Sequence, residues 1–187
     1  MVLSDKTHDH LPARQLVRHM CDVLGERDGA AGVQPARSLP VCTLLGPALA
    51  QVRGSGPGLS AIADHLAALA PQLHWQLRAG ADSDRSPFRE SHANTQIVGP
   101  NGIEQRHDVV IGASLLAAHA VYPNHQHPSR EVYLVLSDGQ WWSEGRDWFR
   151  PGMGGIVFHP SGVSHAMRAT AAPLLALCCL WPDQASA

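Results

Sequence analysis

The stretch YPNHQHPSREVY, residues 122–133, gathers two histidines, a glutamate and two tyrosines within a short span. Along a β-strand, alternate side chains point to the same face, so His125 and His127 would lie on one face. Glu131 and Tyr133 are also two residues apart and would share a face. Neutral imidazoles and a carboxylate hold a divalent first-row metal while leaving positions open for a substrate. The stretch therefore predicts a metal site built on strands.

A second stretch, GGIVFHPSGVSH at residues 154–165, adds a turn and a further histidine. Gly154, Pro160, Gly162 and His165 follow the spacing G-x5-P-x-G-x2-H. The proline and the glycine favour a tight turn between two strands. His165 comes after that turn, at the start of the next predicted strand, and is placed to supply a third imidazole.

Together the two stretches resemble the two motifs of the cupin superfamily, G-x5-H-x-H-x3,4-E-x6-G and G-x5-P-x-G-x2-H-x3-N. Three positions depart from the motifs: His119 stands at the first glycine, Gly139 comes one residue late, and Ala169 replaces the asparagine. The resemblance implies a cupin fold, a double-stranded β-helix or jelly-roll barrel. It also implies a divalent transition metal (Zn, Fe, Mn, Ni or Co) bound by His125, His127, Glu131 and His165.

The part of the chain before these motifs has a helical pattern. Apolar residues recur at helical spacing in residues 13–24, 42–52 and 59–73. In the third segment one stripe comprises Leu59, Ile62, Ala63, Leu66, Leu69 and Ala70, and Gly58 or Ser60 is the expected cap. We therefore expect two domains: an N-terminal helical region, residues 1–72, packed on a metal-binding β-barrel, residues 73–187.

After residue 71 the pattern changes to short apolar runs separated by turn residues. The expected strands lie within residues 74–78, 95–99, 108–122, 131–144, 154–160, 164–170 and 174–181. Many short strands at close spacing favour an antiparallel sandwich or a small barrel, so the fold class is mainly β with N-terminal helices. Asp138 and Gly139 stand between two apolar runs and predict a hairpin turn.

Composition excludes several classes of partner. The formal charge of -2 and the pI of about 6.6 give no basic footprint for nucleic acid or an anionic membrane. The twelve histidines of the chain favour metal binding, and the four cysteines lack CxxC spacing. No apolar run is long enough to span a membrane, and the first ten residues lack a signal-peptide core. We expect a cytoplasmic protein that binds small molecules.

Tyr133 distinguishes among the families of the cupin superfamily. The pattern H-x-H-x3-E-x-Y, preceded by Tyr122 and by helices, resembles the cupin-type dimethylsulfoniopropionate (DMSP) lyases of marine bacteria. The resemblance implies a metal-dependent carbon-sulfur lyase that cleaves DMSP to acrylate and dimethyl sulfide, with Tyr133 as the base. We expect Tyr122 to contact the sulfonium or to assist proton transfer. Trp141, Trp142, Trp148 and Trp181 are further candidates for the sulfonium site.

Other histidines of the predicted barrel are interpreted as structural. His159 precedes the turn proline and is expected at the surface or as a cap. His119 is expected near the mouth of the barrel, and His107 also falls within the barrel region.

Two other functions fit the same motifs. The first is another metal-dependent cupin enzyme, a dioxygenase or a sugar isomerase or epimerase, which would need no tyrosine base. The second is a non-catalytic cupin that senses a ligand, although the helical segments lack a basic recognition helix for DNA. Cupins often pair, so a homodimer is an expected assembly. The sequence leaves open which metal binds, whether His125 is a direct ligand, and whether the helices form a lid.

Overall fold

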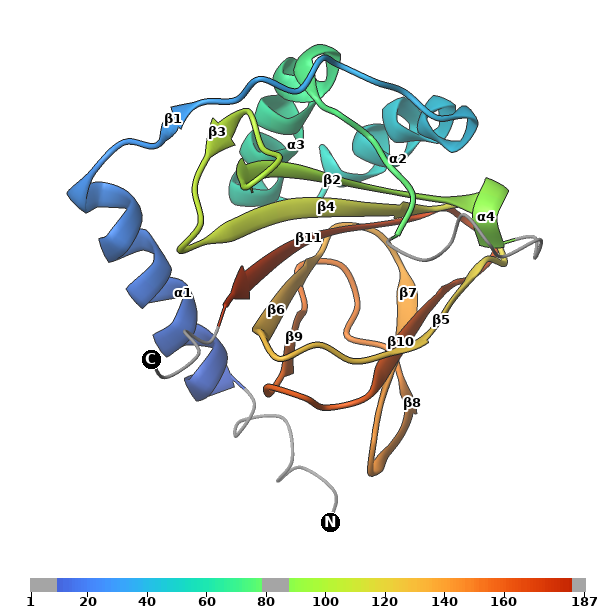
Figure 1. The fold of residues 1–187 in the computed structure, drawn as a ribbon. Helices are drawn as coiled ribbons and strands as arrows, with labels where there is room; N and C mark the ends of the chain where they lie inside the picture. Colours follow the sequence, from blue (N-terminus) through green and yellow to red (C-terminus); the bar gives the residue numbers. More distant parts are fainter. Residues whose placement is uncertain (1–9, 79–87, 183–187) are drawn as a thin grey trace.

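Two β-sheets face each other in the computed structural model, which describes residues 10–78 and 88–182 (Figure 1). The larger sheet has the strand order β1-β3-β2-β4-β11-β6-β9 and the smaller sheet β5-β10-β7-β8. The strands are β1 Ala30–Ala31, β2 His92–Gly99, β3 Glu104–Gln105, β4 Val110–Leu116, β5 Val121–His125, β6 Arg130–Val135, β7 Gly139–Ser143, β8 Arg146–Phe149, β9 Ile156–His159, β10 His165–Ala169 and β11 Leu174–Trp181.

Helices cover the larger sheet on its outer side. In Figure 1, α2 and α3 lie across β2, β4 and β11 on the side away from the smaller sheet, while α1 runs beside β6, β9 and β11. The helical segments are α1 His10–Glu26, η1 Pro40–Leu44, α2 Leu45–Val52, α3 Pro57–Leu69, η2 Ala70–Gln72 and α4 Phe88–Ser91. Within the described residues, no helix combines the length and the apolar character that a membrane span requires.

The core between α3 and the sheet confirms the predicted apolar stripe. Ala63 and Leu66 are buried against Leu115 and Leu175 of the sheet, and the other stripe residues pack around them. The helix begins earlier than predicted, because Gly56 is its N-cap with φ 114° and Pro57 occupies the first turn. Neither Gly58 nor Ser60 is the cap: the left-handed φ favours glycine, and proline suits the first helical position. The domain boundary at residues 72 and 73 stays a prediction.

The sheets do not close into the predicted barrel. Consecutive strands mostly alternate between the sheets: β4 and β6 belong to the larger sheet, whereas β5 and β7 belong to the smaller one. The chain therefore crosses the space between the sheets repeatedly, and each sheet is completed by strands that are distant in sequence. The fold is mainly β, as predicted, with two facing sheets in place of a closed barrel.

The hairpin predicted at Asp138 and Gly139 is wrong, because the strands on either side lie in different sheets. β6 pairs with β11 and β9, whereas β7 pairs with β10 and β8. The favoured two-residue hairpin turn needs positive φ at both central positions, and neither residue has it. Gly139 serves close packing instead, since a Cβ there would lie 2.3 Å from Cδ1 of the buried Leu174.

His119 occupies the position of the first motif glycine and keeps a glycine-like conformation. Its φ is 63°, in the left-handed region, and its backbone N–H donates to the Thr170 carbonyl at 2.8 Å. The side chain is exposed, so it does not face the space between the sheets. The departure from the motif therefore leaves the local turn intact.

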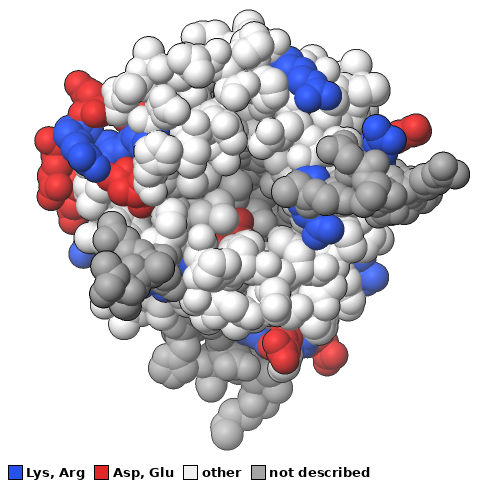
Figure 2. Space-filling model, in the orientation of Figure 1, with Lys and Arg blue, Asp and Glu red and all other residues white. Residues whose placement is uncertain are grey.

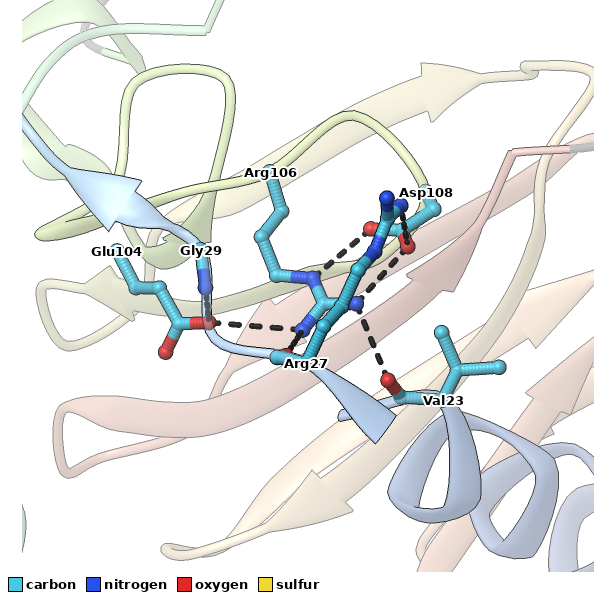
Figure 3. A network of polar contacts seen from close by, with 6 residues as sticks. All are labelled: Val23, Arg27, Gly29, Glu104, Arg106 and Asp108. Carbon is cyan, nitrogen blue, oxygen red and sulfur yellow. Dashed lines mark hydrogen bonds and ion pairs between the residues drawn. The ribbon is translucent and has the colours of Figure 1, made fainter. Parts of the chain in front are cut away.

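A buried arginine ties the end of α1 to the segment that leads into β4 (Figure 3). The last carbonyls of a helix have no partner within the helix. Arg106 satisfies two carbonyls here, because its Nη2 donates to Val23 O at 3.1 Å and its Nη1 to Arg27 O at 2.7 Å. Its Nε and Nη2 also donate to the two carboxylate oxygens of Asp108, both at 2.9 Å. The network fixes α1 against the sheet.

We expect Asp108→Asn to destabilise the fold at neutral pH. Hydrogen bonds from Arg106 hold the pKa of Asp108 well below its ordinary value of 3.8. A lowered folded-state pKa contributes stability above the unfolded-state pKa, and this contribution is lost as the pH falls below it. Thermal denaturation should show a lower Tm for the variant at about pH 7 and a smaller difference at about pH 3.

Asp64→Asn is the matched control for this measurement. Asp64 pairs with Arg53 at 2.7 Å, but both side chains are largely exposed, and such pairs contribute little to stability. An Asp108→Asn deficit that stays constant across the pH range would contradict the assigned role of the carboxylate.

Candidate metal centre

Three histidines and one glutamate converge between the two sheets. His125 ends β5, His127 follows it by two residues, and His165 begins β10 directly opposite His125. Glu131 comes from β6 of the other sheet. One ring nitrogen from each histidine lies within 4.8 Å of the other two. The strand crossings therefore bring together the side chains that the two motifs carry separately.

Each imidazole is oriented by the same kind of backbone contact. The Nδ1 atom lies within hydrogen-bonding distance of a carbonyl two residues away, at 3.0 Å for His125 to Pro123, 3.0 Å for His127 to Ser129 and 2.9 Å for His165 to Val163. A carbonyl only accepts, so the proton belongs on Nδ1 and each neutral ring keeps its lone pair on Nε2. Contacts of this type orient metal-binding histidines in proteins.

Glu131 is the acidic group of the cluster. Its side chain is buried, and its Oε2 lies 3.2 Å from Nε2 of both His127 and His165. Burial opposes ionisation, but the interactions with His127 and His165 outweigh it and lower the pKa of Glu131 to about 2. The carboxylate is therefore negatively charged at neutral pH.

The donor set fits a divalent cation. With Nδ1 protonated, the Nε2 lone pairs of His127 and His165 face a carboxylate oxygen, which also accepts. The buried Nε2 of His165 has no hydrogen-bond partner among the described residues. A proton or a metal ion between these atoms removes the conflict, and the hydrogen bond to Glu131 accordingly raises the pKa of His127. Imidazole nitrogens with a carboxylate oxygen suit first-row transition metals.

The ring of His125 also lies near the rings of His127 and His165. Its ring centroid lies 4.2 Å from that of His165 and 6.0 Å from that of His127. Burial lowers the pKa of His125 to about 4, with His165 adding to the effect. The ring is therefore neutral near pH 7 and offers an unprotonated nitrogen.

A cavity of about 550 Å³ opens beside this cluster. Figure 2 shows the corresponding face hollowed near its centre, with acidic atoms visible inside the hollow. The floor includes a row of residues paired across β6, β11, β4 and β2, namely Tyr133, Cys178, Gly112 and Gln96. A Cβ on Gly112 would lie 2.3 Å from the Thr95 carbonyl oxygen, so glycine lets the strands approach here.

Both tyrosines of the opening stretch line this cavity and are buried. Burial and the nearby Glu131 carboxylate raise the pKa of Tyr133 well above its ordinary value. Burial also raises the pKa of Tyr122, whose hydroxyl accepts a hydrogen bond from Asn94 Nδ2 at 3.1 Å. Both phenols are therefore protonated at neutral pH unless a nearby cation stabilises the phenolate.

The interpretation of His159 as a surface or capping residue is wrong. His159 is fully buried, and its ring stacks on that of His165 at 4.1 Å. It lies directly opposite Glu131 in the β6–β9 pair, so both side chains point to the same face. Its Nδ1 lies 3.1 Å from Ser143 Oγ. Alternation from the buried Val157, two residues earlier on β9, is the signal that would have placed it inside.

The four tryptophans named as sulfonium candidates do not line the cavity. Trp141 is buried in the core, Trp148 lies under the Arg168 guanidinium, and Trp181 packs on His19. Residues outside both motifs line the wall instead, among them Gln76, Arg78 and Asn94. Nothing in the motif spacing pointed to them, because they reach the site only through sheet pairing.

The two facing sheets, with the motif histidines and glutamate gathered between them, define a cupin fold with N-terminal helices. The family model of dimethylsulfoniopropionate lyase matches residues 13–176, so the chain belongs to the DMSP lyase family. The resemblance predicted from the motifs is confirmed.

Known proteins agree with this assignment. The chain is 34% identical over 128 residues to dimethylsulfoniopropionate lyase DddQ of Ruegeria pomeroyi, a match that covers 65% of this chain and 61% of that protein. The crystal structure of DMSP lyase DddQ from Ruegeria pomeroyi DSS-3 superposes with a TM-score of 0.72 at 24% identity, covering 95% of both chains. A structure from the DMSP lyases RdDddP and RnDddQII gives a TM-score of 0.70 at 21% identity, covering 95% of this chain and 92% of that one. These structures share the fold over 95% of this chain.

We expect the purified protein to bind a divalent transition metal through this cluster. Metal analysis after dialysis against Zn²⁺, Mn²⁺, Fe²⁺, Ni²⁺ or Co²⁺ should give about one ion per chain, and the bound ion should raise the Tm. His127→Ala and His165→Ala should lose most of the metal and the Tm increase. His65→Ala, at an exposed position of α3, is the control and should retain both. Full metal content in both cluster variants would contradict the assignment.

Proposed function

We propose that this protein is a metal-dependent DMSP lyase that cleaves dimethylsulfoniopropionate to acrylate and dimethyl sulfide. Family membership supports the substrate class. The observation that carries the proposal is that the Tyr133 phenol lines the same cavity as His125, His127 and Glu131. The proposed base and the metal centre that would bind the substrate carboxylate therefore lie in one cavity, whose size suits a small substrate.

The reaction is a β-elimination. A proton leaves the carbon next to the carboxylate, and its electron pair forms the new carbon-carbon double bond. The carbon-sulfur bond breaks, and its electrons leave with sulfur as neutral dimethyl sulfide. The sulfonium is already a good leaving group, so the difficult step is removal of the α-proton beside a negatively charged carboxylate.

Tyr133 is the proposed base. A divalent cation held by His125, His127, Glu131 and His165 would act as a Lewis acid toward the substrate carboxylate and lower the pKa of the nearby phenol. Tyr133 Oη would then take the α-proton.

Tyr122 is the proposed partner of the substrate on the opposite wall. Of the two roles expected for Tyr122, assistance of proton transfer is the one proposed, because the Arg78 guanidinium already lies over its ring with Cζ 5.7 Å from the ring centre. Its hydroxyl accepts a hydrogen bond from Asn94, which fixes its position. The homodimer and the cytoplasmic location stay predictions.

Replacing Tyr133 with phenylalanine tests the proposed base. We expect Tyr133→Phe to reduce dimethyl sulfide release roughly 10²- to 10⁴-fold, because the variant has no group to take the α-proton. Bound metal, measured on the same sample, should be unchanged. Ser60→Ala, which removes a hydroxyl on α3 far from the cavity, should keep wild-type turnover. Gas chromatography of the headspace measures the product.

The same assay separates the two other functions. A metal-dependent dioxygenase, isomerase or epimerase would tolerate the loss of the hydroxyl when assayed on its own substrate. A ligand-sensing protein would release no dimethyl sulfide with any of the metals. If wild type and Tyr133→Phe turn over DMSP equally, Tyr133 is not the base, but the protein is still a DMSP lyase.

A further inference from the structure

The cavity is lined by a positively charged side chain, that of Arg78, which belongs to neither motif. Among the described residues that line it, Arg78 is the only lysine or arginine and Glu131 the only aspartate or glutamate. Glu131 is already engaged by His127 and His165. The buried Nε of Arg78, in contrast, has no hydrogen-bond partner among the described residues. A buried guanidinium N–H without an acceptor is costly, which points to an anionic oxygen supplied by a ligand.

The backbone of Arg78 is held in place by a buried histidine. His92 Nδ1–H donates to the Phe88 carbonyl, so its Nε2 is the acceptor, and the Arg78 backbone N–H donates to it at 2.9 Å. Burial lowers the pKa of His92, which keeps this neutral form at pH 7. The His92 ring also stacks on Phe88 with centroids 3.6 Å apart.

The guanidinium lies against two aromatic rings. Its Cζ is 5.7 Å from the centre of Tyr122 and 5.9 Å from that of Phe88. Contacts with ring faces hold a guanidinium in place but occupy none of its N–H donors. Tyr122 in turn lies 4.8 Å from the ring of His125. Tyr122 thus contacts both Arg78 and a residue of the candidate metal centre.

Neighbouring amides extend this polar wall. Gln76 and Asn94 exchange backbone hydrogen bonds at 2.8 Å, which adds the segment around Gln76 to the edge of β2. Arg78 follows Gln76 by two residues, and both line the cavity. The buried Asn94 Oδ1 has no partner among the described residues. This polar wall therefore leaves one buried donor, Arg78 Nε, and one buried acceptor, Asn94 Oδ1, without a partner among the described residues.

We propose that Arg78 binds the carboxylate of the substrate and makes the enzyme specific for sulfonium compounds with a free acid group. The inference rests on the proposed function. A guanidinium donates N–H bonds to carboxylate oxygens, so Arg78 would bind one oxygen of the substrate carboxylate and leave the other for the divalent cation of the proposed function. It therefore directs the acid end of the substrate toward the Arg78 wall. Because α-proton removal increases the negative charge on the carboxylate, the same contact stabilises the transition state.

Steady-state kinetics with an acid and a neutral substrate test this role. Wild type should strongly prefer DMSP over its primary amide, in which the carboxylate is replaced by a carboxamide. Arg78→Gln should raise KM for DMSP roughly 10- to 100-fold, lower kcat as well, and reduce the acid-to-amide preference in kcat/KM by a similar factor. Arg78→Lys, which keeps the charge without the planar fork, should recover part of the preference. The metal content of both Arg78 variants should equal that of wild type.

A matched variant separates a ligand contact from a structural effect. Arg168 also lies over an aromatic ring, with its Cζ 4.2 Å from Trp148, but it does not line the cavity. Arg168→Gln should leave KM and the preference unchanged. An Arg78→Gln enzyme that keeps the wild-type preference while wild type remains an active lyase would overturn the role of Arg78 and leave the proposed function standing.

Binding of propionate provides a readout that needs no turnover. Propionate titrated into the metal-loaded protein should raise the Tm of wild type and Arg168→Gln, and the apparent Kd should weaken roughly tenfold or more in Arg78→Gln. An equal propionate response in wild type and Arg78→Gln, or none in wild type, would refute the inference. If wild type binds propionate through Arg78 but releases no dimethyl sulfide from DMSP, the proposed lyase activity is refuted and carboxylate binding by Arg78 stands.

Discussion

The contact between Glu131 and the Nε2 atoms of His127 and His165 is the interaction on which the centre depends. Backbone carbonyls fix the protons of these rings on Nδ1, which turns their lone pairs toward a carboxylate held ionised. Acceptors that face one another at 3.2 Å need a proton or a metal ion between them.

The alternation of strands between the sheets makes this contact geometrically available. His125 and His165 come from the smaller sheet, whereas Glu131 and Tyr133 come from β6 of the larger one. A single hairpin could not set these side chains face to face, because its two strands share one sheet. The same crossings place the floor residues of β2, β4 and β11 beneath the centre and leave a cavity beside it.

Two charged side chains of opposite sign in this cavity lie at separate positions. The Glu131 carboxylate lies at the histidine cluster, and the Arg78 guanidinium lies on the wall formed with Tyr122. Without a bound cation the phenols are uncharged at neutral pH, since burial raises the pKa of both. Away from the cavity, Arg106 joins the end of α1 to the sheet through Arg27 and Asp108. The buried charges of this network are separate from those of the site.

The sequence by itself determined the local features. Spacing of two along a strand predicted that Glu131 and Tyr133 share a face of β6, whereas His127 lies beyond the end of β5, so strand spacing does not explain its place near His125. Helical periodicity likewise predicted the buried stripe that contains Ala63 and Leu66.

Only the tertiary structure decided which strands face each other. It placed His159 inside, opposite Glu131, and put the residues on either side of Gly139 in different sheets. It also brought Arg78 beside Tyr122 across more than forty residues of chain. These outcomes depend on pairing and packing between distant segments, whereas periodicity reports only how neighbouring residues in one segment are oriented.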